Sequence, residues 1–272
     1  MRIQPLIASL LLYTACGEPS SGPTPPTPPA APTTEHDAVY FVEVASDVGL
    51  VWKHDNGASP NKFFPETMSG GGALFDYDGD GDLAVYAVNG GPLDGVRADR
   101  PPNALFRNDG GHFTAVSQAA GADDRGYGMG TAAGDIDGDG DLDLYVANFG
   151  ANVLLRNDGG LFVDISRSSA TDDSLWGSSC AFADYDRDGD LDLYVANYVR
   201  YALSDAARDN APYMSDYDSY EGDVEKGYPH PANFPGSPDR LYRNDGSGHF
   251  VEVARETGIF DEGGKEIGRA HV

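Results

Sequence analysis

The chain has 272 residues with 40% hydrophobic content, which is enough to bury a sizeable core as one large domain or two small ones. Its 44 acidic residues outnumber 18 basic ones and give a formal net charge of −26, which excludes nucleic acid as a partner, because phosphate binding needs a basic surface. The 35 glycines and 18 prolines, together with the lack of long helical patterns, favour an all-β protein with many turns.

Residues 1–15 have the features of an export signal. Arg2 precedes an apolar run at residues 6–12, which is too short to span a bilayer, and small residues lead to Cys16. The segment resembles a bacterial lipoprotein signal, in which Cys16 becomes the lipidated first residue, although Tyr13 stands where that motif usually has Leu. A plain secretory signal and an uncleaved anchor are the alternatives. We expect an exported cell-surface or outer-membrane lipoprotein, on the periplasmic or extracellular side, that contacts the membrane only through its lipid.

Residues 16–38 form a linker rich in Pro, Thr and Ser. Such a segment cannot build a core and favours extended conformations. Behind a lipidated cysteine it would be a stalk, and a disordered N-terminal tail is the alternative. The two cysteines, Cys16 and Cys180, differ too much in context to form a disulfide framework. Cys180 aligns with small residues of the repeats described next, so we expect a packing residue and not a reactive thiol.

A unit is repeated three times within residues 39–265. Each copy has an aspartate-rich loop, an apolar run that ends in Asn, and an Arg-Asn-Asp-Gly turn followed by Phe. The loops begin at Asp76, Asp135 and Asp184, and the turns occupy 107–110, 156–159 and 243–246. The second and third loops lie 49 residues apart, as do the first two turns. Repeats of this length, built of short strands, predict a β-propeller.

Each unit predicts the four strands of one propeller blade. Residues 142–148, "LDLYVAN", alternate with a period of two and predict a half-buried strand. Asn-Asp-Gly-Gly supplies the positive-φ residues of a tight hairpin. Small residues in "YGMGTAAGD" and "LWGSSCAFAD" predict the strand that enters each loop, close to the propeller's centre. Three complete blades make a partial, open propeller, since closed ones need about four to eight.

Residues 200–238 are an insertion between the second and third strands of the third unit. Their tyrosines and aspartates would suit a ligand surface, because long loops often carry function. A solvated acidic excursion is the alternative.

The aspartate loops have the residue types and spacing of a calcium site. Ca²⁺ takes about six to eight oxygen ligands in a flexible shell. The second and third loops offer carboxylates at positions 1, 3, 5 and 9, a glycine at position 6 and a backbone carbonyl at position 7, whereas Ala84 stands at position 9 of the first. We therefore expect two complete Ca²⁺ sites and one weaker site. The predicted metal ligands are Asp76, Asp78, Asp80, Asp82, Asp135, Asp137, Asp139, Asp141, Asp143, Asp184, Asp186, Asp188, Asp190 and Asp192.

Other interpretations of these loops fit less well. An EF-hand needs Glu at position 12 and flanking helices, whereas position 12 lies in a predicted strand here. Mg²⁺ demands strict octahedral geometry and gives up its waters reluctantly. Plain acidic turns are the alternative, but carboxylates ~4 Å apart repel by ~4 kcal/mol at an effective dielectric constant of ~20. We expect the recurring Arg107, Arg156 and Arg243 to be structural partners of the acidic loops.

These loops, with the aromatic-Gly pairs Tyr127-Gly128 and Trp176-Gly177, resemble FG-GAP/VCBS repeats, the integrin-α type of calcium-binding β-propeller. More closely, "FVEVASDVGLVWKHDNG", "PETMSGGGALFDYDGDGDL" and "LYRNDGSGHFVEVARETGI" resemble the cartilage acidic protein-like (ASPIC/UnbV-associated) family from about Tyr40 to Lys265. The resemblance implies an extracellular propeller, usually of about seven blades, whose calcium ions brace loops on one face. The family's C-terminal ASPIC/UnbV segment is not present, and the cysteines that relatives often carry in the inserted loop are missing.

The C-terminal residues 266–272 do not continue the repeat pattern. Residues 267–272, "IGRAHV", equal the translation of a common sequencing-library adapter. We therefore expect a truncated fragment that departs from its natural sequence near Lys265.

The sequence favours binding over catalysis. It has no H-E-x-x-H zinc motif, no G-x-S-x-G nucleophile elbow and no P-loop, so we predict no catalytic residue. The leading hypothesis is a binding or adhesion module for an unidentified glycan or protein ligand. The alternative is a propeller-type polysaccharide lyase or another carbohydrate-active enzyme, with Lys226, Tyr228 and His230 as candidate bases, and a structural spacer of the cell envelope is the third possibility.

Overall fold

A computed structural model describes residues 42–95, 99–205, 228–261 and 263 of the chain. The chain divides into two units, Met1–Val42 and Glu43–Val272, and the second is described below. The predicted signal (1–15), the linker (16–38) with Cys16, and the tail (266–272) lie outside the described residues. Those assignments remain predictions.

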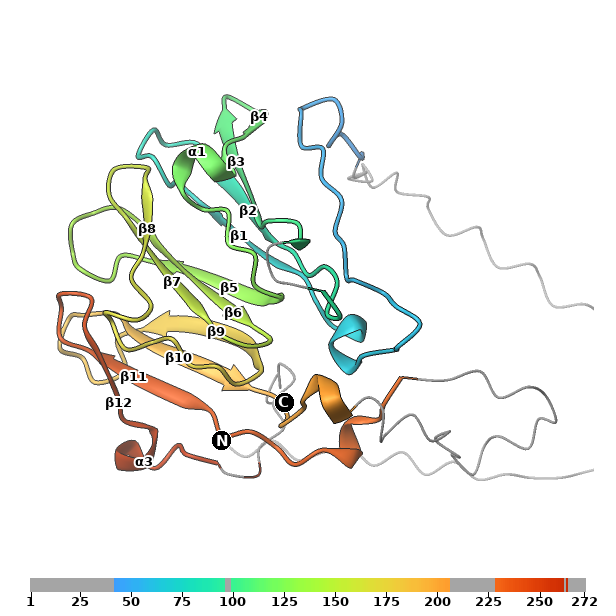
Figure 1. Cartoon of the computed structure of the whole chain (residues 1–272). Coiled ribbons are helices and arrows are strands. Elements are labelled where there is room, and N and C mark those ends of the chain that lie inside the picture. The colour runs from blue at the N-terminus through green and yellow to red at the C-terminus, as the bar shows by residue number, and fades with distance from the viewer. Residues whose placement is uncertain (1–41, 96–98, 206–227, 262, 264–272) are drawn as a thin grey trace, which may run out of the picture. The chain divides into compact units, whose positions relative to one another are not determined.

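The second unit contains three four-stranded antiparallel sheets, and each sheet corresponds to one sequence unit (Figure 1). We call them blades 1, 2 and 3. Blade 1 has β1 (Gly71–Phe75), β2 (Ala84–Val88), β3 (Ala104–Asp109) and β4 (His112–Ala115). Blade 2 has β5 (Gly128–Gly134), β6 (Asp143–Asn148), β7 (Val153–Asn157) and β8 (Phe162–Asp164). Blade 3 has β9 (Gly177–Ala183), β10 (Asp192–Asn197), β11 (Arg240–Asn244) and β12 (Phe250–Glu252). In every blade the strands pair in chain order, as the repeat predicted.

Helical structure in the described residues is limited to single turns. They are η1 (Phe64–Thr67), α1 (Ser117–Ala120), η3 (Leu203–Asp205), η4 (Pro231–Asn233) and α3 (Ala254–Thr257). No helix in the described part of the chain is long and apolar enough to cross a membrane.

The Asn-Asp-Gly-Gly turns form the hairpins that the sequence predicts. They join β3 to β4 and β7 to β8, and both glycines of each turn have positive φ, at 62° and 92° for Gly110 and Gly111 and at 64° and 89° for Gly159 and Gly160. A side chain at these positions would be strained, which explains why glycine recurs there.

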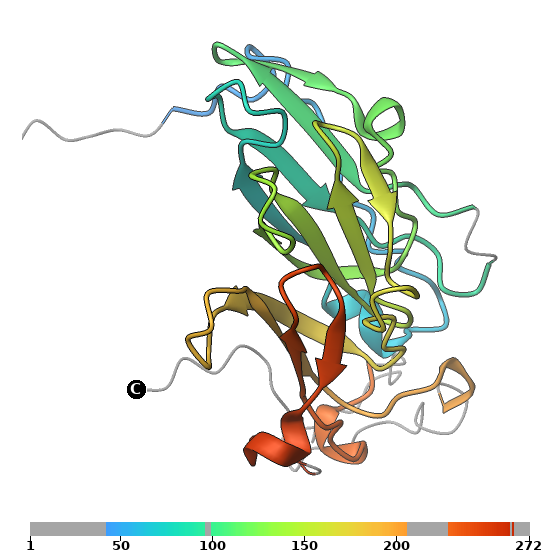
Figure 2. The same cartoon turned by 90° about the vertical axis from the view of Figure 1, so that its left-hand side faces the viewer.

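The first strands of the blades lie side by side, β1 against β5 and β5 against β9. Figure 2 shows the three sheets following one another in chain order. A Cβ atom added to Gly130 of β5 would lie 3.2 Å from the carbonyl oxygen of Ser178 in β9. Small residues are therefore required where these strands meet, as the sequence predicted.

The prediction that "LDLYVAN" forms a half-buried strand is wrong for β6, whose six residues are all buried. Alternate residues of β6 face two different hydrophobic cores, and neither face is exposed to solvent. Leu144 and Val146 pack with blade 1, around Phe75 and Tyr86. Tyr145 belongs to a second cluster, shared with blade 3. A central strand between two stacked sheets is apolar on both faces, a pattern that periodicity alone does not distinguish from half burial.

The described blades form an open array and not a closed ring. On the outer side of blade 1, Leu74 is 67% exposed. On the outer side of blade 3, alternate residues of β9, Ser179, Ala181 and Ala183, are exposed. The predicted all-β class and partial propeller are confirmed.

Candidate metal centre

Each aspartate loop joins the first strand of a blade to the second, and its first aspartate shapes it. In blade 2, Asp135 accepts hydrogen bonds from the backbone N–H groups of Gly138 (2.8 Å) and Gly140 (3.1 Å), one through each carboxylate oxygen. Asp76 and Asp184 act in the same way in the other two loops. Gly140, at φ 97°, permits the turn that brings these N–H groups together.

Carboxylates converge in all three loops. In blade 2, ligand atoms of Asp135, Asp137 and Asp143 lie within 4.8 Å of one another. Asp184, Asp186 and Asp192 form the equivalent group in blade 3, and Asp76, Asp78 and Asp80 form a group in blade 1. Three carboxylates at this separation repel one another unless a proton or a cation lies between them.

Asp137 tests whether a cation fits the blade 2 loop. Its Oδ1 atom is buried and has no hydrogen-bond partner, an arrangement that is costly for a carboxylate oxygen. Burial, with the neighbouring charges of Asp139 and Asp135, raises the pKa of Asp137 above its ordinary value. Burial also raises the pKa of Asp143 to about 7. An oxygen-rich site with an unsatisfied buried carboxylate suits a hard divalent cation.

Asp143 also ties the loop to the rest of the blade. It is fully buried, and its two oxygens accept hydrogen bonds from the backbone N–H groups of Ile136 in the loop and Asn157 in β7, both at 2.8 Å. Asp192 makes the same pair of bonds, to Tyr185 and Asn244. The sequence predicted a metal ligand at this position and missed its structural role. The available signal was that the aspartate stands at the start of a strand that is buried.

Two other predicted ligands have backbone partners of their own. Asp139 is exposed, lies outside the blade 2 carboxylate group, and accepts a hydrogen bond from the N–H of Asp141 at 2.9 Å. The carboxylate of Asp141 accepts from the N–H of Gly159 at 2.7 Å and so docks the hairpin turn on the loop. Asp188 repeats the position of Asp139, and Asp82 repeats that of Asp141. Their assignment as ligands stays a prediction.

The first loop differs from the others as Ala84 predicted. Ala84 is buried in the core at position 9, where the other loops have Asp143 and Asp192. The carboxylate group is then built from positions 1, 3 and 5, Asp76, Asp78 and Asp80. Asp78 has a raised pKa, caused by burial and then by Asp80.

The repeated arginines form their ion pairs outside the aspartate loops, although the charge of Arg156 also acts on Asp137 in the blade 2 loop and opposes the rise of its pKa. Arg107 and Arg156 form ion pairs with the aspartates of their own turns, Asp109 and Asp158, both at 2.9 Å. Arg243 lies 3.9 Å from Glu256 in α3. All three arginines are partly exposed, so these ion pairs contribute little to stability.

A repeated bond between blades was not predicted. The side-chain amide of Asn157 donates to the carbonyl oxygen of Tyr77, the second residue of the blade 1 loop, at 2.7 Å. Asn244 of blade 3 donates to Ile136, the second residue of the blade 2 loop, at the same distance. The loops of blades 1 and 2 are thus each held by the following blade, and the recurrence of Asn before Asp-Gly was the available signal.

The insertion is anchored by its described ends. Tyr201 and Phe234 are buried in an aromatic cluster with Phe64 and Trp176. Of the candidate bases, Lys226 lies outside the described residues, and the Nδ1 of His230 accepts a hydrogen bond from the N–H of Ala232. Burial and Glu66 raise the pKa of Tyr228, which is opposite to what a general base requires.

A comparison with protein-family models identifies an FG-GAP-like repeat at residues 76–146 and again at residues 135–195. Both matches begin at the first aspartate of a loop and end in the second strand of the next blade. No curated protein matches the sequence. The chain therefore contains FG-GAP-like repeats, and in this structure they form four-stranded propeller blades.

Proposed function

We propose that the chain is an exported, calcium-braced β-propeller module that binds a glycan or protein partner, related to the cartilage acidic protein-like (ASPIC/UnbV-associated) family that it resembles. The observation that carries the calcium assignment is the blade 2 loop. Asp135, Asp137 and Asp143 converge there, and a buried oxygen of Asp137 has no protein partner.

The residues divide the work of such a site. Bound Ca²⁺ supplies the positive charge that offsets the converging carboxylates. Asp135 holds the loop in shape through Gly138 and Gly140, and Asp143 connects it to β7. Because Asn157 also bonds to the blade 1 loop, a rigid loop stabilises the contact between neighbouring blades. Calcium in this proposal braces the surface that binds a partner, and it takes no part in a reaction.

Thermal unfolding in Ca²⁺ and in EDTA tests the assignment. If Ca²⁺ is present at ~100 times its dissociation constant, each occupied site adds ~2.7 kcal/mol to the free energy of unfolding. Asp137→Asn should remove most of the contribution of the blade 2 site, and it should leave stability in EDTA unchanged or slightly raised, because it removes one of the charges that repel one another in the empty loop. Asp261→Asn, which removes the same charge from an exposed position outside the loops, is the control.

Titration calorimetry should resolve two tight sites and one weaker site, the last abolished by Asp78→Asn. Equal unfolding temperatures of the unaltered protein in Ca²⁺ and in EDTA would contradict the proposal. If Asp137→Asn leaves the stabilisation by Ca²⁺ intact, the Ca²⁺ site lies elsewhere in the protein.

Binding is preferred to catalysis on the evidence of the two candidate bases that lie in the described residues. His230 caps a helical turn, and burial and Glu66 raise the pKa of Tyr228. A glycan array, with a parallel assay for new unsaturated sugar ends, separates the two functions. Binding without new ends supports the module, whereas new ends that depend on Tyr228 would establish a lyase.

The lipid anchor is part of the proposal and rests on the sequence around Cys16. Expression in a bacterium fed a labelled fatty acid should label the protein, and Cys16→Ser should abolish the label and release the protein from the membrane fraction. A labelled Cys16→Ser variant would place the lipid elsewhere.

A further inference from the structure

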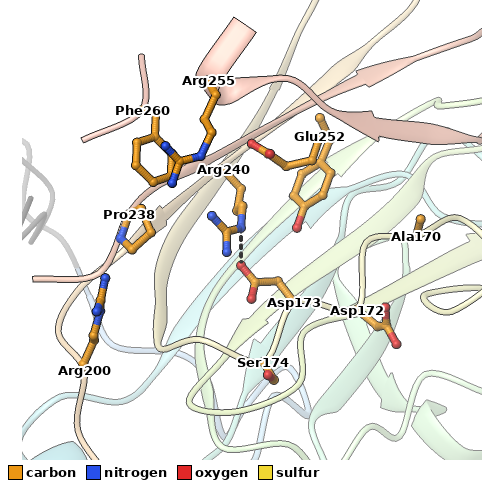
Figure 3. Close-up of a pocket in the computed structure, with 11 residues that line it drawn as sticks. Ala170, Asp172, Asp173, Ser174, Arg200, Pro238, Arg240, Glu252, Arg255 and Phe260 are labelled. Carbon is orange, nitrogen blue, oxygen red and sulfur yellow. Dashed lines mark ion pairs between the residues drawn. The ribbon is translucent and has the colours of Figure 1, made fainter. Parts of the chain in front are cut away.

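A pocket of about 590 Å³ lies on blade 3, away from the aspartate loops. It is bounded by β11, β12, the residues around α3 and the link from blade 2, residues 170–174. Figure 3 shows three arginines in it, Arg200, Arg240 and Arg255, which come from different segments. Only 18 lysines and arginines occur in the chain, so three arginines in one pocket is a marked concentration of guanidinium groups, although three carboxylates line the same pocket.

The repeat supplies an internal comparison for this pocket. Counting from the turn arginine of each blade, Arg240 and Tyr242 of β11 correspond to Val153 and Leu155 in blade 2 and to Ala104 and Phe106 in blade 1. Blades 1 and 2 have apolar residues at these two positions, and blade 3 has a cation and a phenol instead. The ring of Tyr242 still packs in the core between blades 2 and 3, so the clearest departure is Arg240, a charged residue at a position that is apolar in the other two blades.

The arginines keep most of their hydrogen-bonding capacity. Arg240 bonds through Nε to Asp173 at 3.1 Å, which fixes its orientation and leaves its terminal nitrogens available. The guanidinium carbon of Arg255 lies 3.6 Å from the centre of the Phe260 ring, which holds the group in place. The side chain of Arg200 makes no ion pair with any described residue. Arg240 and Arg255 are thus planar donors with an orienting contact, and such donors match a carboxylate.

Tyr242 adds a hydroxyl donor to the pocket. It is 4% exposed and lines the pocket, and its hydroxyl has no hydrogen-bond partner among the described residues. Its ionisation is strongly disfavoured, because burial and the neighbouring Asp173 raise its pKa, so the hydroxyl remains a donor. The hydroxyl is not among the fully buried side-chain atoms that lack a partner, so it faces the pocket, where water or a ligand can accept its hydrogen bond.

We infer that this pocket binds a carboxylated sugar. The guanidinium groups would receive the carboxylate. Asp172, Asp173 and Glu252, which line the same pocket, would accept hydrogen bonds from sugar hydroxyls and would repel a bare phosphate or sulfate. The mixture of guanidinium donors and carboxylate acceptors therefore favours an anion that also carries hydroxyl groups. The pocket is separate from the metal loops, so the inference does not depend on calcium.

Two matched ligands test the inference. Methyl β-glucuronide and methyl β-glucoside differ only in the carboxylate, and the dissociation constant of each is measured with the full chain by calorimetry or ligand-detected NMR. The glucuronide should bind, and the glucoside should bind at least about tenfold more weakly, the loss of one charge-assisted bond. Acetate and inorganic phosphate, as bare anions, should bind more weakly than the glucuronide.

Variants connect binding to the pocket. Arg200→Gln and Arg255→Gln, which break no ion pair, should each weaken glucuronide binding about tenfold. Arg107→Gln is the control, because it removes the same charge from blade 1, where Arg107 pairs with Asp109 of its own turn, and binding should not change. Tyr242→Leu introduces the blade 2 residue and should also weaken binding.

The inference is overturned if the glucuronide does not bind to the folded protein, if the glucoside binds equally well, or if Arg200→Gln and Arg255→Gln have no effect. If acetate or phosphate binds as tightly as the glucuronide, the pocket is a general anion site and the proposed specificity for a carboxylated sugar is wrong. Asp137→Asn should leave glucuronide binding intact. Loss of the calcium response and loss of sugar binding are therefore separate outcomes.

Discussion

Asp143 shows how one side chain can serve both a metal site and the fold. Its oxygens accept hydrogen bonds from two backbone N–H groups, and they also belong to the carboxylate group of the blade 2 loop. Asp139, four residues before the strand begins at Asp143, is exposed and bonds only to Asp141 within its own loop. Nothing in the repeat D-x-D-x-D-G-D-x-D distinguishes these two aspartates, and only burial separates their roles.

Replacing Asp143 should therefore destabilise the protein even without metal. Asp143→Ala leaves two buried N–H groups unpaired, and we expect a loss of about 3 kcal/mol in EDTA. Asp139→Ala should cost within about 1 kcal/mol under the same conditions. Urea unfolding in EDTA measures both. Equal losses for the two variants would show that Asp143 is only a ligand.

The thiol of Cys180 is chemically quiet for a reason that the structure supplies. Its Sγ lies 3.8 Å from the carbonyl oxygen of Tyr145, and burial raises its pKa to about 12 from an ordinary value of 9.0. Because the thiolate is the reactive form, the folded protein should react slowly with a disulfide reagent at pH 8. The raised pKa also means that this group favours folding below pH 9, and that its contribution is lost as the pH rises toward 12.

A Cys16→Ser variant isolates this thiol. Labelling at pH 8 should be slow in buffer and fast in urea, with the native rate rising steeply above pH 9. Rapid native labelling at pH 8 would mean that Cys180 is accessible and that the packing role is wrong.

At the scale of elements, the second residue of each aspartate loop fills a space in the following blade. Tyr77 stacks on Phe162 of blade 2 with ring centres 6.3 Å apart, and Ile136 is buried in a cluster with Phe250 of blade 3. Tyr185, at the same position in blade 3, is 38% exposed, because the described residues contain no blade beyond it. The loops therefore connect blades as well as turning the chain.

Ile136→Ala should cost about 2–4 kcal/mol, because it opens a cavity between blades 2 and 3. Tyr185→Ala, at the matched position, should stay within about 1 kcal/mol. Chemical denaturation in saturating Ca²⁺ keeps the loops equally occupied in both variants. Similar losses at the two positions would show that the residue serves its own loop and not the next blade.

What the sequence could predict depends on the range of each interaction. Hairpins, strand order and the converging aspartates follow from local spacing, and all of them are present. The burial of β6 on both faces, the bond from Asn157 to Tyr77 and the pairing of Arg156 with Asp158 depend on which neighbour lies closest in space. Arg240 and Tyr242 look like ordinary strand residues until the link at Asp173 is brought beside them.

For the whole molecule, the balance between charge and metal decides stability. The chain carries a formal net charge of −26, and carboxylates converge in all three loops. Such an excess makes the folded state repel itself, while stacked blades bury the apolar residues that oppose the repulsion. Bound cations at the loops act at the points of highest charge density, where distant counter-ions screen least.

Salt should therefore stabilise the metal-free protein more than the calcium-loaded one. At ~0.1 M salt the screening length is about 10 Å, and it falls to about 3 Å at ~1 M, so added NaCl weakens repulsion between loops and within the surface. In EDTA, raising NaCl across this range should lift the unfolding temperature by a few degrees, about 2–4 °C for each ~1 kcal/mol in a domain of this size. With Ca²⁺ bound, the same addition should have a smaller effect, because the densest clusters are already neutralised.

Choline chloride should reproduce the effect of NaCl, whereas a response limited to sodium would indicate that Na⁺ occupies the loops. Equal salt responses in EDTA and in Ca²⁺ would show that the loop carboxylates are not the main source of the repulsion.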